Sequence, residues 1–201
     1  MTILVVLLSL VRGASGQQTP APSASGTLSG ASDTIASQLN QQLSFVETEV
    51  VDAAKAMPED KYSFVPTSGE FKGVRNFAQQ VMHIATANYL LYGAIVPDDP
   101  TAATKRQAAA SAQTKDQILQ YLQASFAFAH KAIGTINAEN MLRPVKRAPN
   151  PYASTALELA VFGCSHGTDI YGQMVEYLRM NGIIPPATAN RPARGSAPPV
   201  R

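Results

Sequence analysis

The stretch FGCSHGTDIYGQMVEYLRMNGIIPP, residues 162–186, decides the fold class because it carries a long helical pattern with a clear end. Asn181-Gly182 ends the pattern, since glycine accepts the left-handed backbone that stops many helices. The prolines at 185–186 cannot continue it. Extended backwards, the pattern predicts a helix over residues 154–180.

A rotation of 100° per residue divides this helix into an apolar and a polar stripe. His166 lies between the stripes, beside Ile170. That position suits a ligand facing a crevice or a half-exposed structural histidine, and spacing alone favours the structural role. The apolar stripe, which we expect to face the core, comprises Leu157, Val161, Cys164, Tyr171, Val175 and Leu178.

Three further segments carry apolar residues at helical spacing, and no convincing strand alternation is present. The first spans residues 33–56, with Ser32 or Asp33 as the expected cap. The second begins at Asn76 and the third after Thr114, each with a glutamine three residues later, as in a capping box. Four such helices predict an all-α fold, a four-helix bundle with a long connection between its first two helices.

The composition describes one globular domain with flanking segments. Of 201 residues, 45% are hydrophobic and 15% are charged, which argues against a disordered chain. The single cysteine excludes an internal disulfide framework. A net charge of +2 is too small to indicate a nucleic-acid partner, and we expect none.

The N-terminus is typical of an export signal. An apolar run, ILVVLLSLV at 3–11, precedes small residues at 14 and 16, which predicts cleavage before Gln17. A buried strand or helix end is the alternative, and no Lys or Arg precedes the run. We expect a signal peptide at 1–16, a flexible linker at 17–32, the bundle at 33–188 and a Pro/Arg-rich tail at 189–201, in an exported protein (periplasmic or extracellular) without a membrane anchor after cleavage.

Two histidines on different helices are candidate metal ligands. His83 lies on the second helix, and His166 lies on the fourth. Bundle cores build metal sites from facing helices, but a firm site normally has three or more protein ligands. The third histidine, His130, most simply occupies a helix surface. Cys164 lies about 200° around the helix from His166, so it reads as a small core residue.

Three motifs together resemble the DinB-like superfamily of bacterial four-helix bundles. They are AKAMPEDKYSFVPT (54–67), RNFAQQVMHIATANYLL (75–91) and HGTDIYGQMVEYLRMNGIIPP (166–186). They occur in the order of the family, and the first most resembles the loop of its exported members. The resemblance covers residues 33–188 and implies a nickel or zinc site. Its ligands would be one histidine of the second helix and an H-x3-H pair of the fourth.

Carried onto this chain, the implied ligands fall on His83 and His166, while the third falls on Ile170, which cannot bind a metal. Asp169, three residues after His166, is the alternative third ligand, and His130 is a weaker one. Thr86 stands where relatives often carry an aspartate. The implied triad is therefore broken.

Two functions follow from the resemblance and the broken triad. The first is an exported protein that binds a divalent metal (Zn or Ni) weakly and acts as a metal-dependent transferase or hydrolase on a small molecule of unknown identity. The second is a metal-free bundle for binding or scaffolding in the cell envelope. Self-association through apolar helix faces is a weaker third alternative, and homodimer formation is left open.

Overall fold

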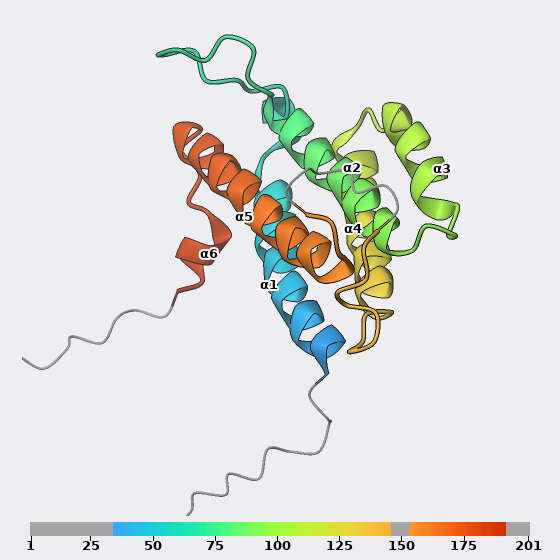
Figure 1. Ribbon diagram of the computed structural model, residues 1–201. Coiled ribbons are helices and arrows are strands. Elements are labelled where there is room, and N and C mark those ends of the chain that lie inside the picture. The colour runs from blue at the N-terminus through green and yellow to red at the C-terminus, as the bar shows by residue number, and fades with distance from the viewer. Residues whose placement is uncertain (1–33, 146–152, 192–201) are drawn as a thin grey trace, which may run out of the picture. The chain divides into compact units, whose positions relative to one another are not determined.

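The computed structural model describes residues 34–145 and 153–191. The named secondary-structure elements in these ranges are all helices (Figure 1). Within these ranges the backbone forms an isolated bridge between Pro144 and Thr155 but no named strand. The predicted all-α bundle is confirmed. In chain order the elements are α1 (Ile35–Ala56), η1 (Glu59–Lys61), α2 (Phe77–Ile95), α3 (Thr101–Ala108), η2 (Ala109–Ser111), α4 (Lys115–Ile133), α5 (Ala156–Met180) and α6 (Pro186–Ala189).

The four long helices α1, α2, α4 and α5 form the bundle, with α1 packed against α4 and α5, and α2 against the same two. The long connection after α1 therefore crosses to the opposite corner of the bundle. Just past the end of α2, Asp99 pairs with Lys131 near the end of α4 at 3.2 Å, so α2 and α4 run parallel. The short helix α3 packs on α2 and returns the chain to the end where α4 begins.

All four long helices begin with a reciprocal capping box. The boxes at Asn76 and Thr114 are the predicted ones. The cap of α1 is Thr34 rather than Ser32 or Asp33, which lie outside the described residues, and α5 is capped by Thr155. The boxes satisfy free backbone N–H groups at each helix start, so local sequence fixes where every bundle helix begins.

The end of α5 follows the prediction from Asn181-Gly182. Gly182 has a φ of +73°, a backbone conformation that glycine adopts without strain. Its N–H donates to the carbonyl of Arg179 at 2.9 Å, and the next N–H, of Ile183, donates to Leu178 at 3.0 Å. These two bonds form the Schellman motif, which satisfies carbonyls that the helix end would leave free.

The first part of the connection after α1 is attached to the ends of two bundle helices. Tyr62 donates its hydroxyl to the carbonyl of Ala54 at 2.7 Å. Lys115, the first residue of α4, donates Nζ to the carbonyls of Lys55 at 2.8 Å and Met57 at 2.7 Å. A lysine at a helix C-terminus also complements the partial negative charge there, so these contacts join α1 to α4.

The buried face of α5 is rotated from the predicted stripe. Val161, expected in the core, is 52% exposed, whereas Leu178 and Cys164 are buried as predicted. The core face instead includes Gly163 and Gly167, which lie so close to their neighbours that little side chain fits. Its buried residues are Ala156, Leu159, Ala160, Gly163, Cys164, Gly167, Ile170, Met174, Tyr177 and Leu178.

We expect Gly163→Ala to destabilise the fold by about 1–3 kcal/mol, the usual cost of overpacking a core. An added Cβ would lie 2.6 Å from Cζ of Tyr92, a fully buried ring that has no room to withdraw. The measurement is the free energy of unfolding in urea.

Gly172→Ala is the matched control on the same helix, because a Cβ there meets no heavy atom within 4 Å. It should stabilise the fold by about 0.5–1 kcal/mol, since glycine is a poor residue inside a helix. Equal effects of the two alanines would show that α5 does not approach α2 over Gly163.

Candidate functional site

The structure brings His83 of α2 and His166 of α5 face to face. Their Nε2 atoms lie 3.1 Å apart, and the two rings meet edge to face with centroids separated by 5.0 Å. The antiparallel packing of α2 and α5 causes this pairing, and it also places Gln80 against Gln173, nearer the start of α2 and the end of α5. The two carried-over positions therefore meet in one interhelical seam.

Towards the start of α2, the seam continues with hydrogen bonds of two glutamine side chains. Gln80 is 2% exposed and donates Nε2 to Oε1 of Gln173 at 2.8 Å. Gln173 donates Nε2 to Oδ2 of Asp169 at 3.4 Å. Oε1 of Gln80 accepts no hydrogen bond from the residues that the structure describes. A buried acceptor thus remains available one turn before His83.

Burial and neighbouring charge act on the protonation of both histidines. Partial burial, then the charge of Arg75 and then His166 itself lower the pKa of His83. Burial lowers the pKa of His166 as well; the Asp169 carboxylate raises it, and Arg75 opposes that effect. Both rings are therefore neutral at pH 7, the form in which imidazole accepts a hydrogen bond or binds a metal.

A single hydrogen bond joins two neutral imidazoles at this distance. One Nε2 must carry the proton and the other must accept it, so His83 and His166 adopt different tautomers. The ring of Phe162 lies nearly parallel to that of His166, at 8° and with centroids 5.9 Å apart. This contact, one turn earlier on α5, restricts the orientation of the imidazole.

The donor set supplies two metal ligands and lacks a third. Two nitrogens bound to one tetrahedral zinc at about 2.0–2.1 Å would lie about 3.3 Å apart, close to the separation of the two Nε2 atoms. Ile170, at the third position, is 3% exposed and packs in the core. Among the described residues no three His, Cys, Asp or Glu side chains are grouped to hold an ion.

The other candidate ligands have different surroundings. Asp169 is exposed, and it contacts Gln173 while acting on His166 through its charge. His130 lies between α1 and α4, where its Nδ1 is 2.7 Å from Oδ1 of Asn40 and its Nε2 is 3.0 Å from Oε2 of Glu47. We expected His130 on the helix surface, but its side chain is partly buried and bridges α1 and α4.

Sequence reasoning did not identify Gln80, Gln173 or Phe162 as parts of the site. A glutamine in a helix interior can face either solvent or a neighbouring helix, so spacing carries no signal for a buried amide contact between helices. Pairing α2 and α5 antiparallel through the two histidines would have brought Gln80 near Gln173, because both lie towards the same end of the bundle.

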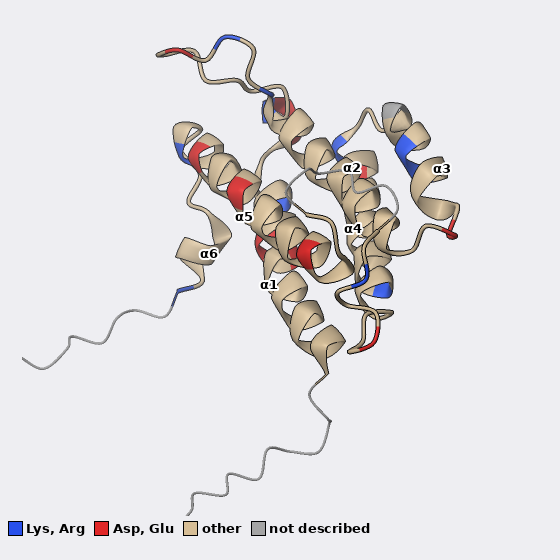
Figure 2. Ribbon diagram, viewed as in Figure 1, with Lys and Arg blue, Asp and Glu red and all other residues tan. Residues whose placement is uncertain are grey.

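Charge does not distinguish the histidine seam from the rest of the molecule. Figure 2 shows acidic and basic positions spread over several elements, with Lys105 and Arg106 on α3 and Asp169 and Glu176 on α5. None of the helices in the described ranges is long and apolar enough to cross a membrane. The site is defined by its two imidazoles and the buried amide beside them.

These observations define the class of protein: an all-α bundle with paired histidines on facing helices. Residues 42–174 match the DinB superfamily over well over half of the chain. The chain therefore belongs to the DinB superfamily, in agreement with the resemblance of its three motifs. No curated protein matches the chain.

We expect the histidine pair to make the folded protein less stable as the pH falls. Because both pKa values are lowered on folding, the folded protein binds fewer protons than the unfolded chain, whose histidines titrate near about 6.5. The contribution is present above that pH and is lost as pH falls through the folded-state values.

Urea unfolding between pH 7.5 and 5 measures this loss. The double variant His83→Gln/His166→Gln should lose less stability than the native protein over that range, while the carboxylates contribute equally to both. Identical pH dependence would contradict the lowered pKa values.

Proposed function

We propose that the protein is a DinB superfamily bundle that binds a divalent metal, Zn or Ni, weakly through His83 and His166. The separation of 3.1 Å between the two Nε2 atoms is the observation that carries this proposal. The pair is neutral and partly buried, so one Nε2 already offers a lone pair, and the other does so once its proton moves to Nδ1 of the same ring. With two protein ligands, the remaining positions belong to water or to a small molecule.

When bound, such an ion would act as a Lewis acid or lower the pKa of a bound water. The residues around the pair have separate tasks in this proposal. Phe162 restricts the orientation of the His166 ring, and the hydrogen bond between Gln80 and Gln173 joins α2 to α5 beside the pair. In this proposal the protein acts as a metal-dependent transferase or hydrolase on a small molecule.

A metal-free bundle is the second candidate function, and the burial of Ile170 favours it. An isoleucine that is 3% exposed contributes to the core and leaves the third ligand position apolar. The two histidines then serve as a hydrogen-bonded contact between α2 and α5. In this reading the protein binds or scaffolds a partner without catalytic activity.

Titration calorimetry with zinc and with nickel separates the two functions. The native protein should bind one ion weakly, and Ile170→His should bind it much more tightly, because it adds a third imidazole one turn from His166. The further change His166→Ala should abolish the gain. Failure of Ile170→His to gain affinity would show that position 170 does not face the pair.

Two controls keep this titration decisive. His130→Ala removes a histidine between α1 and α4 and should leave the affinity unchanged. Asp169→Asn tests the alternative third ligand. If the native protein binds the ion tightly and this variant weakens the binding, Asp169 is the third ligand. Because Ile170→His alters the core, its unfolding curve with and without zinc shows whether the variant folds.

We also propose export, with cleavage after residue 16. The apolar run at 3–11 and the small residues at 14 and 16 support it, and they lie outside the described residues. Intact-mass analysis of protein from the envelope fraction should give a chain beginning at Gln17. A mature species that retains residues 1–11 would refute this proposal.

A further inference from the structure

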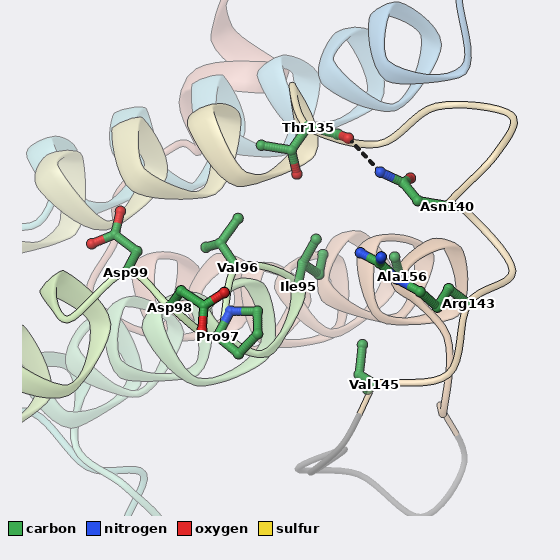
Figure 3. A pocket seen from close by; sticks show the side chains of 10 residues that line it. All are labelled: Ile95, Val96, Pro97, Asp98, Asp99, Thr135, Asn140, Arg143, Val145 and Ala156. Carbon is green, nitrogen blue, oxygen red and sulfur yellow. Dashed lines mark hydrogen bonds between the residues drawn. The ribbon is translucent and has the colours of Figure 1, made fainter.

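A cavity lies at the end of the bundle where α2 and α4 both terminate. Its volume is about 340 Å³, and it is bounded by residues after α2, by the end of α4, by the loop before α5 and by the first residue of α5 (Figure 3). From His83 to Ile95, twelve residues of α2 rise about 18 Å, so this cavity is separate from the histidine seam.

The two ends of the cavity carry opposite charges. Asp98 and Asp99 lie on the side of α2, and Arg143 lies on the side of α5 (Figure 3). The guanidinium of Arg143 extends past Ala156 towards Ile95 in this view. Within the described part of the chain, Arg143 and Asp98 make no ion pair with another residue.

Neighbouring groups keep the carboxyl of Asp99 ionised, and the ammonium of Lys131 offsets its charge. Asp99 accepts from the backbone N–H of Thr101 at 2.9 Å and from Nζ of Lys131 at 3.2 Å. The bonds to Thr101 and the nearby Lys131 hold the pKa of Asp99 down, at about 2. The last turn of α2 carries no basic residue to offset the partial negative charge of its carbonyls.

Apolar side chains separate the two charged ends. Ile95 and Val96 at the end of α2 and Val145 before α5 line the cavity, each partly buried. The volume is at the lower end of the range of roughly 300–1,000 Å³ typical of small-molecule sites. It therefore suits a ligand of amino-acid size better than a nucleotide cofactor.

We propose that this cavity binds a small zwitterion whose ammonium and carboxylate groups lie at opposite ends of an aliphatic chain, such as a free ω-amino acid. The ammonium group faces Asp98 and the carbonyl end of α2, and the carboxylate pairs with the Arg143 guanidinium, whose planar donors suit a carboxylate. The aliphatic part contacts Ile95, Val96 and Val145. This site is independent of the metal proposed for the histidine pair.

Titration calorimetry with three probes tests the two charged ends together. 5-Aminopentanoate carries both charges at opposite ends, pentylamine carries only the ammonium group, and pentanoate carries only the carboxylate. We expect saturable 5-aminopentanoate binding in the millimolar range or tighter, with each half-probe at least about tenfold weaker. Absence of saturable 5-aminopentanoate binding, or half-probes that bind as well as 5-aminopentanoate, would overturn the proposal.

Two surface variants assign the ends. Arg143→Gln should weaken 5-aminopentanoate binding at least about tenfold without further weakening pentylamine, and Asp98→Asn should weaken 5-aminopentanoate without further weakening pentanoate. Both residues are exposed and without ion pairs among the described residues, so these changes should leave the fold intact.

Arg106→Gln on α3 is the matched control, because Arg106 does not line the cavity, and it should leave 5-aminopentanoate affinity unchanged. His83→Gln/His166→Gln should also leave it unchanged. Loss of 5-aminopentanoate binding in this double variant would place the ligand in the histidine seam and overturn the assignment, whatever the outcome of the metal titration.

Discussion

The close approach of α5 to its neighbours is the constraint on which the site depends. Gly163 lies under the buried ring of Tyr92 of α2, and Gly167 lies under the side chain of Val46 of α1. Larger residues at either position would push α5 outwards, because a packed core has no free volume to absorb them. At the short distance that the glycines permit, His83 and His166 come within hydrogen-bond range.

The parallel course of α2 and α4 has a second consequence. It requires a return segment, which α3 provides, and it places the C-terminal ends of two long helices together. Carbonyl groups at those ends attract positive charge, and Lys131 already pairs with Asp99 there. One topological feature thus produces an electrostatically polar end that lies about 18 Å along α2 from the histidines.

The helix ends were predicted from the sequence better than the contacts between helices. The capping boxes at Asn76 and Thr114 and the stop at Gly182 depend on residues near one another in the chain, so short patterns identify them. The buried face of α5 was misjudged because an apolar stripe assigns Val161 to the core and overlooks glycines that face a neighbouring helix. The helix α3 was missed because only Ala102 is buried in it, which leaves no apolar period to detect.

The side chain at 170 decides what the histidine pair contributes. A buried isoleucine stabilises the fold by about 1.5–3 kcal/mol through burial alone, so the core around α5 does not depend on a bound ion. An ion at the pair must also replace the hydrogen bond between His83 and His166, which is worth about 0.5–1.5 kcal/mol. That competition lowers metal affinity by up to about tenfold beyond the loss of a third ligand. In the proposed function, the same two rings join α2 to α5 when no ion is present and separate slightly to chelate one.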